Sequence, residues 1–233
     1  MFTTIRRYHV KQPGQIDEII RRIESGLVPI IAAQAGFQSY AAIDAGDGQE
    51  ISISVYADRA AADAANRAAA AWVKDNLATV LGPADVTVGE RIVAASLEEQ
   101  NVKVVQQGYA AFGRGDIPGL LALLDPKVSW ITPGPADLPT AGTRTGHAAV
   151  TEFFQALAAV GDIVRFEPRQ FTAQGDRVIV TGDDTTRVKA TGKSLEFRWT
   201  HVFTVRQGKV VAFEEYGDMS PLVAEIRSAQ SRV

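Results

Sequence analysis

Apolar and polar residues alternate along residues 197–206, and this period of two predicts a β-strand with one buried face. The residues expected on that face are Phe197, Trp199, His201, Phe203 and Val205. A second strand is expected over residues 209–216, which carry Phe213 and Glu215. The two strands are separated by Gln207 and Gly208, so they should form a hairpin.

The turn at Gln207 and Gly208 decides which residues of the two strands face each other. A two-residue type I′ turn needs a positive φ at Gln207, which its side chain disfavours, so a three-residue loop with Gly208 in the left-handed region is expected. That loop places Trp199 opposite Glu215, with His201 one diagonal step away on the same face. A two-residue loop would instead place Glu215 beside Thr200. The first arrangement predicts an imidazole and a carboxylate together on an aromatic surface.

Residues 1–95 follow the order βαββαβ, which predicts a ferredoxin-like α+β unit. Strands are expected at 2–10, 37–44, 50–56 and 85–93, and helices at 16–35 and 58–81. Asp58 is a suitable N-cap for the second helix, and Gly82-Pro83 ends it.

Residues 96–233 predict a second α+β domain with long, mostly antiparallel strands. Ser96 and Glu99 form a capping box that starts a helix over 97–112. Further helices are expected at 118–124, at 146–157 and after Ser220-Pro221, and strands at 128–132, 162–173, 177–190, 195–206 and 210–216. Residues 133–142 are expected to form a loop.

Composition excludes several classes of function. A net charge of −3 without a basic cluster gives no reason to expect nucleic acid as a partner. The chain has no cysteine and three histidines, shows no metal-ligand spacing and has no glycine-rich phosphate loop, so no cofactor is expected. No apolar run of signal-peptide or membrane-spanning length occurs, so a cytoplasmic location without membrane contact is expected.

Residues 97–230 resemble the SnoaL-like branch of the ketosteroid isomerase and nuclear transport factor superfamily. The resemblance rests on Tyr109-Ala110-Ala111-Phe112, Val128-Ser129-Trp130, Gly146-His147 before Phe153-Phe154, the strand W-x-H-x-F and the strand E-E-Y-x-D. It implies a cone-shaped α+β barrel whose curved sheet encloses a pocket for a small molecule.

Residues 1–94 resemble the antibiotic biosynthesis monooxygenase-like family. The matching stretches are Ala35-Gly36-Phe37, the D-A-G-D-G turn, the strand I-S-I-S-V-Y and the helix end A-A-A-W-V-K-D-N-L-A. That family implies an α+β barrel that dimerises through its sheets. Asn66, Trp72 and Asn76 do not match the spacing of the active residues of its cofactor-free members. His9 is the sole candidate for the histidine of its haem-degrading members, and it is interpreted as an ordinary strand residue. A structural or dimerising unit is therefore expected, with Trp72 packed on the sheet. We expect a homodimer.

The SnoaL-like resemblance and the hairpin geometry both point to Glu215 and His201 as catalytic residues. Glu215 stands where the family usually has aspartate. Burial among aromatic side chains should raise its pKa so that it can accept and return a proton. The pocket is expected to be lined by Trp130, Phe154, Phe197, Trp199, Phe203 and Phe213, with Tyr109, Tyr216 and Asp184 as further candidates. Which face of the strand 177–190 lines the pocket stays open.

These residues predict a cofactor-independent proton-transfer enzyme, of cyclase, isomerase or hydrolase type, for an apolar oxygenated small molecule. The alternative is a non-catalytic small-molecule-binding or stress-associated dimeric protein, because a buried Glu–His pair can be purely structural.

Overall fold

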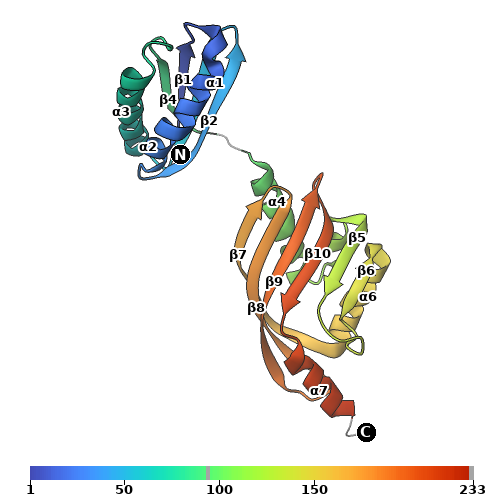
Figure 1. Cartoon of the computed structure of the whole chain (residues 1–233). Coiled ribbons are helices and arrows are strands. Elements are labelled where there is room, and N and C mark those ends of the chain that lie inside the picture. Colours follow the sequence, from blue (N-terminus) through green and yellow to red (C-terminus); the bar gives the residue numbers. More distant parts are fainter. Residues whose placement is uncertain (93–94, 231–233) are drawn as a thin grey trace. The chain divides into compact units, whose positions relative to one another are not determined.

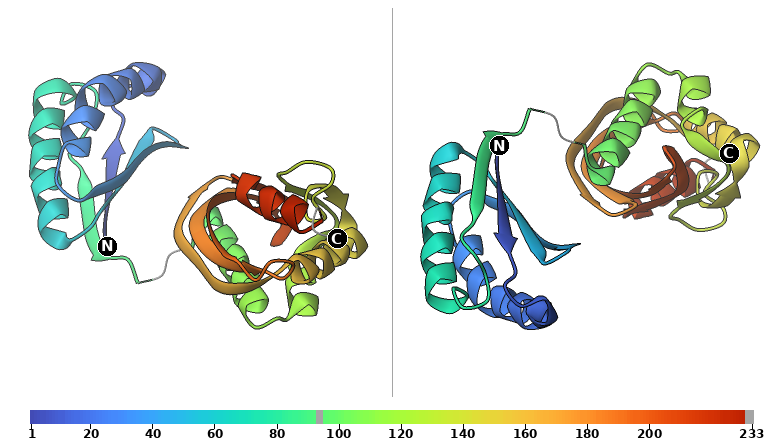
Figure 2. Two further views of the ribbon diagram at one scale, coloured as in Figure 1. Left: turned by 90° about the horizontal axis from the view of Figure 1, so that it is seen from below. Right: turned by 90° about the horizontal axis from the view of Figure 1, so that it is seen from above.

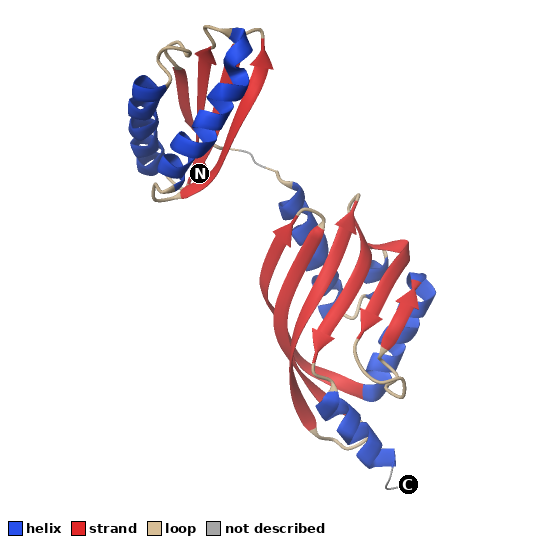
Figure 3. Cartoon of the chain, in the orientation of Figure 1, coloured by secondary structure: helices blue, strands red, loops and turns tan. Residues whose placement is uncertain are grey.

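The computed structural model describes residues 1–92 and 95–230. The chain divides into two compact units, Met1–Ala94 and Ala95–Val233. Each unit combines helices with a single sheet (Figure 3). The predicted mixed α+β class is therefore confirmed.

In the first unit, helices cover one face of a four-stranded antiparallel sheet (Figure 1). The strands lie in the order β2-β3-β1-β4. The elements are β1 (Phe2–His9), a 3-10 turn (Pro13–Gln15), α1 (Ile16–Arg22), a π-helical turn (Ile23–Leu27), α2 (Val28–Ala32), β2 (Phe37–Gly46), β3 (Gln49–Tyr56), α3 (Arg59–Asn76) and β4 (Asp85–Glu90).

The helix α3 is shorter than expected. The Asp58 side chain accepts a hydrogen bond from the Ala61 amide and caps its start, as predicted. The helix ends at Asn76 and not near residue 81, because Leu81 pairs with Val10 just beyond β1 and draws the chain out of the helix. The strand β4 ends at Glu90, and the expected end at Val93 lies outside the described residues.

Trp72 is partly buried and packs against the core cluster of the first unit, to which Tyr8 of β1 belongs. Its ring lies against Gly26 in the π-helical turn, so close that a Cβ atom at Gly26 would be 2.4 Å from the Trp72 ring. Only a glycine leaves room for the indole there. The π-helical turn was not foreseen. It ends two residues before Pro29, whose ring nitrogen cannot donate a helical hydrogen bond.

The second unit has a six-stranded sheet in the order β6-β5-β10-β9-β8-β7, in which only the β5–β10 pair is parallel. The sheet curls around the helix α4 (Figure 2). The elements are α4 (Leu97–Gly113), α5 (Ile117–Leu121), β5 (Leu124–Thr132), β6 (Gly142–Thr145), α6 (Gly146–Val160), β7 (Gly161–Gln174), β8 (Arg177–Val188), β9 (Ser194–Arg206), β10 (Lys209–Gly217) and α7 (Ser220–Gln230). The Ser96 hydroxyl caps α4 as predicted, whereas the edge strand β6 was not foreseen.

The loop predicted for the β9–β10 hairpin is wrong. Arg206 pairs with Lys209, and both Gln207 (φ 51°) and Gly208 (φ 74°) lie in the left-handed region, as in a two-residue type I′ turn. Continued without interruption, that register would place Glu215 beside Thr200. A β-bulge between Val210 and Ala212 shifts it by one residue. Glu215 therefore lies directly opposite His201, and Trp199 lies opposite Gly217.

Candidate functional site

His201 is held in the interior of the second unit by aromatic side chains. It is 7% exposed, and its ring stacks on Trp199 with centroids 3.9 Å apart and planes 12° apart. The Tyr109 hydroxyl on α4 lies 2.9 Å from His201 Nδ1. In the tautomer in which Tyr109 donates this hydrogen bond, the imidazole proton is on Nε2. That atom faces Glu215, with 3.9 Å between Nε2 and the carboxylate oxygen Oε1.

The separation of 3.9 Å is too long for a hydrogen bond between His201 and Glu215. The Glu215 carboxylate is therefore not hydrogen-bonded to the imidazole. It lines the cavity, and part of its surface is accessible. Burial raises the pKa of Tyr109, and the negative charge of Glu215 raises it further. Tyr109 thus stays protonated and can remain the hydrogen-bond donor to His201.

The stacked position of Trp199 depends on a glycine in the neighbouring strand. Gly182 of β8 pairs with Trp199, and a Cβ atom at Gly182 would lie 2.2 Å from the indole ring. On its other face Trp199 has Phe166 of β7, with ring centroids 5.0 Å apart. The ring is therefore fixed by packing, and it fixes the plane of His201 in turn.

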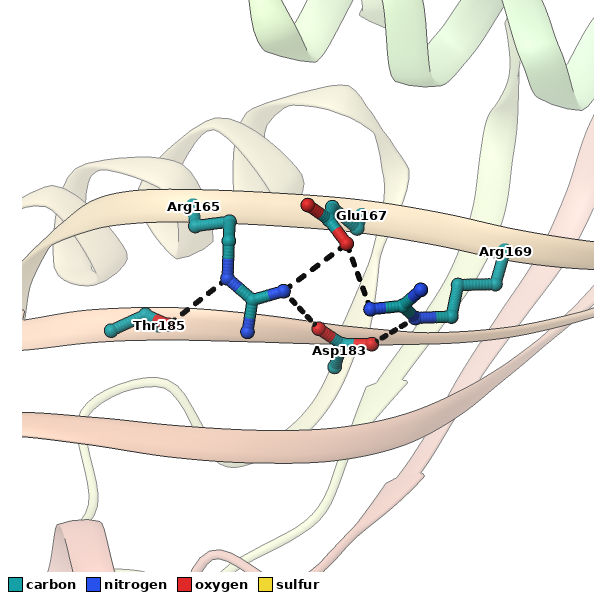
Figure 4. Close-up of polar contacts among 5 residues, drawn as sticks. All are labelled: Arg165, Glu167, Arg169, Asp183 and Thr185. Atoms are coloured by element: carbon teal, nitrogen blue, oxygen red, sulfur yellow. Dashed lines mark hydrogen bonds and ion pairs between the residues drawn. The ribbon is translucent and has the colours of Figure 1, made fainter.

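The structure also decides which face of β8 lines the pocket. Asp184 points inward, where its carboxylate accepts a hydrogen bond of 2.7 Å from the Thr186 hydroxyl. Asp183 belongs to the outer face, where it and Glu167 form ion pairs with Arg165 and Arg169 (Figure 4). Neighbouring residues of a strand point to opposite faces. Asp183 therefore forms its ion pairs on the outer face because Asp184 points into the pocket.

The pKa of the Asp184 carboxyl group is raised above its ordinary value. Burial raises the pKa to about 6, the hydrogen bond from Thr186 lowers it, and the negative charge of Glu215 raises it. The carboxyl groups of Asp184 and Glu215 therefore share the pocket with His201 and Tyr109. With a pKa of about 6, Asp184 changes its protonation state just below neutral pH.

These groups lie in a cavity of about 150 Å³ between the concave face of the sheet and the helices. Of the residues expected at the site, the cavity is lined by Tyr109, Trp130, Phe154, Asp184, Phe197, Trp199, His201, Phe203, Phe213 and Glu215. Tyr216 is the exception. It is 55% exposed, and its hydroxyl donates a hydrogen bond of 2.6 Å to Glu214. Tyr216 and Glu214 are therefore not pocket residues.

Several cavity residues were missed from the sequence. Phe166 belongs to β7, whose two bulges interrupt the period of two. Phe112 comes from the helix α4, and Met219 stands directly before α7. Thr186 could have been found, because it stands two residues from Asp184 on the same face of a strand.

Trp130, which lines this cavity, has a hydrogen-bond donor without a partner among the described residues. Its side chain is 6% exposed, and the donor is the buried indole nitrogen Nε1. The ring stacks on Phe213 with centroids 3.9 Å apart, so it is not free to turn. A buried donor without an acceptor is costly, and an oxygen atom of a ligand would satisfy it.

Neither a metal site nor a membrane span emerges from residues 1–92 and 95–230. No three or more His, Asp or Glu side chains in this part of the chain converge as metal ligands would. No helix there is long and apolar enough to cross a membrane.

Comparison with known proteins identifies the second unit. A family model for the SnoaL-like domain matches residues 105–213. An NTF2-like protein from Burkholderia xenovorans is 40% identical over 56% of this chain and 98% of its own, with a TM-score of 0.52. The chain therefore belongs to the NTF2-like family with a SnoaL-like domain. This confirms the resemblance proposed for residues 97–230.

Two further solved structures are similar over a comparable share of the chain. An NTF2-like protein of unknown function from Burkholderia pseudomallei is 31% identical over 55% of this chain and 97% of its own, with a TM-score of 0.52. TerC, solved after co-crystallisation with polyporic acid, is 32% identical over 55% of this chain and 98% of its own, with a TM-score of 0.51. A search among curated proteins finds no match.

Proposed function

We propose that the SnoaL-like unit is a cofactor-independent proton-transfer enzyme, of cyclase or isomerase type, for an apolar oxygenated small molecule. The observation that carries this proposal is the position of Glu215 directly opposite His201, inside a cavity that is otherwise mostly apolar. An apolar cavity excludes water and strengthens the electrostatic interactions of the few polar groups inside it.

In the proposed mechanism, Glu215 is the base and His201 stabilises the charge that develops. The Glu215 carboxylate takes a proton from a carbon atom next to a substrate carbonyl group, so that the C–H bond breaks and an enolate forms. The Nε2–H of His201, held in that tautomer by Tyr109, donates a hydrogen bond to the enolate oxygen. Glu215 then returns the proton to another carbon atom. Alternatively, the enolate carbon attacks a second carbonyl carbon of the same molecule, the C=O π bond of that group opens to an alkoxide, and Glu215 gives its proton to the alkoxide oxygen.

Asp184 and Trp130 are proposed to bind the polar parts of the substrate. The Trp130 N–H is a donor without an acceptor, so it suits a carbonyl or hydroxyl oxygen of the ligand. Asp184, with a pKa of about 6, accepts a hydrogen bond from a substrate hydroxyl group when it is ionised. TerC was co-crystallised with polyporic acid, and its similarity to this chain supports an organic ligand here as well.

A deuterium-exchange assay tests the proposal without knowledge of the natural substrate. We expect the protein to catalyse deuterium incorporation next to the carbonyl group of aromatic ketones in D₂O, measured by NMR with a panel of acetophenones and tetralones. Catalysed exchange that disappears in Glu215→Gln supports the mechanism. A protein that binds these ketones or polyporic acid without any exchange would be a binding protein, which is the alternative function.

For the first unit, we propose a ferredoxin-like dimerisation domain related to the antibiotic biosynthesis monooxygenases. The strand order β2-β3-β1-β4 with antiparallel neighbours supports it. Within the unit, the sheet face away from the helices carries paired isoleucines, with Ile5 opposite Ile53 and Ile43 opposite Ile51. Ile43 is 43% exposed. A second copy of the unit would cover this apolar face.

The chain is accordingly expected to form a homodimer. Light scattering at micromolar concentration should give twice the mass of 25.0 kDa for the wild type. The variant Ile51→Asp, which places a charge in the centre of the proposed contact, should give the mass of a single chain. A single-chain mass for the wild type would contradict the proposal. Ile179→Asp, at an exposed residue of the second unit, is the control.

A further inference from the structure

The interior of the first unit contains two charged side chains. On the helix-covered face of the sheet, Arg6 of β1 is 4% exposed and Glu50 of β3 is 1% exposed. Buried charges are rare unless they are paired, because the cost of removing them from water is high. These two do not form an ion pair with each other, or with another described residue.

Within the part of the chain that the structure describes, the side chain of Arg6 is hydrogen-bonded only to neutral groups. It donates to the Ser54 hydroxyl at 3.0 Å and to the Asn66 side-chain oxygen on α3. A guanidinium group has five N–H bonds, so these contacts leave donors for another partner. Since the Asn66 oxygen accepts from Arg6, its amide NH₂ remains as a further donor. The Arg6 guanidinium group and the Asn66 amide group therefore both have N–H donors left for a hydrogen-bond acceptor.

Glu50 is a poor counter-ion for Arg6. Both of its carboxylate oxygens are buried without a hydrogen-bond partner among the described residues. Burial raises the pKa of Glu50 to about 7, although the positive charge of Arg6 lowers it. At neutral pH the carboxyl group is therefore protonated for much of the time, and the charge of Arg6 is only partly balanced.

A cavity of about 370 Å³ lies beside Arg6, between β1, α3 and the segment that leads into β4. Its polar lining includes Arg6, Lys11, Asn66 and Lys74, and no carboxylate belongs to the lining. Its apolar lining includes Ala70, Val73, Leu81 and Val86. The electrostatic potential of such a cavity favours an anion, and the apolar walls favour an organic one.

We propose that this cavity is a binding site for a small organic anion, a monocarboxylate with a compact apolar body, whose carboxylate binds to Arg6. The planar guanidinium fork matches the two oxygens of a carboxylate. Asn66 donates beside it, and Lys11 and Lys74 contribute positive charge at the cavity. The site belongs to the first unit and is independent of the proton-transfer site proposed for the second.

Binding of the anion is coupled to the protonation of Glu50. The groups whose charges act on Arg6 are Glu50 and the tyrosines Tyr8, Tyr40 and Tyr56, and Lys11 and Lys74 line the cavity. Burial raises the pKa of all three tyrosines, so they stay neutral near pH 7. When Glu50 ionises, its negative charge opposes that of the ligand. The affinity should therefore fall severalfold as the pH rises from 6 to 8.

NMR titration of the full chain with benzoate tests this site. Amide signals of β1 and α3 report on the first unit, so any binding of benzoate in the second unit is seen separately. We expect benzoate to bind at least about tenfold more tightly than the neutral isostere benzamide. Arg6→Gln should weaken benzoate binding about tenfold or more, and Lys74→Gln severalfold. Lys103→Gln, at an exposed position of the second unit, should change nothing.

Other outcomes are equally clear. Equal shifts with benzoate and benzamide, or no shift of β1 and α3 amides with benzoate, would overturn the proposal. Inorganic phosphate binding more tightly than benzoate would overturn the carboxylate as the ligand class. Should Arg6→Gln fail to fold, the pH dependence of benzoate affinity tests the site instead. Glu50→Gln must then bind benzoate with the same affinity at pH 6 and pH 8, and a dependence like that of the wild type contradicts the site.

Discussion

Replacing Glu215 by glutamine is expected to lower turnover by about 10²–10⁴-fold, the range that general acid–base catalysis contributes. Glutamine keeps the size and the position of the side chain opposite His201 but cannot accept a proton. Folding and ligand affinity should therefore stay close to those of the wild type. The measurement is the rate of deuterium exchange into the ketone that the wild type converts best, together with its dissociation constant.

Glu214 offers a matched control, because it is the neighbouring glutamate on the other face of β10. Its carboxylate accepts a hydrogen bond from Tyr216, and it does not line the cavity. Glu214→Gln should therefore leave the exchange rate within about twofold of the wild type, since substitutions outside the core and the site usually have small effects. An equal loss in both variants would show that the effect comes from the strand and not from the base.

The effect of changing His201 distinguishes its two proposed contributions. If His201 donates to the enolate oxygen, His201→Ala should lower the exchange rate by about 10²–10³-fold, as the loss of an oxyanion-hole donor does. If it only orients Glu215, the loss should be smaller. Tyr109→Phe removes the hydrogen bond to Nδ1 and should shift the pH profile of the rate, which a purely structural hydroxyl would not do.

The second large effect concerns the stability of the first unit, which should fall as the pH rises from 5 to 8. The folded-state pKa of Glu50 is about 7, above its ordinary value of 4.5. The folded state therefore binds more protons than the unfolded state between these two values. The stabilisation is fully present below about pH 4.5 and is lost as the pH rises through 7. The shift corresponds to about 3 kcal/mol of unfolding free energy.

Urea unfolding at several pH values, followed by the amide signals of β1 and β3, measures this loss. In Glu50→Gln the side chain cannot ionise, so the difference between the wild type and the variant should change by about 3 kcal/mol across the range. Glu90→Gln, at an exposed residue of the same sheet, should follow the wild type at every pH. Parallel curves for the wild type and Glu50→Gln would show that Glu50 is ionised in the folded state without cost.

The sequence by itself determined most of the local structure. Helix starts at Asp58 and Ser96 follow from side chains that satisfy the first free amide groups of a helix. The inward face of β9 follows from its period of two, because a strand that buries one face must place every second residue there. The aromatic residues of the pocket could be named for the same reason.

Only the tertiary structure decided how these elements meet. The turn at Gln207-Gly208 has two residues, yet Glu215 still reaches His201 because a bulge at Val211 shifts the register. The same irregularity occurs where β10 pairs with β5, a strand some 80 residues earlier in the chain. A period of two cannot reveal such an insertion, since it depends on both neighbours of the strand at once. The choice between Asp183 and Asp184 was open for the same reason.

The charged interior of the first unit was hidden from the sequence in a different way. Arg6, Glu50, Ser52 and Ser54 look like the solvated face of two strands, and the helices cover that face all the same. The opposite face carries the isoleucines. Periodicity shows that a strand has two different faces, but which of them the helices cover is set by the connections between the elements. That choice buries Arg6 and Glu50 and creates the cavity beside them.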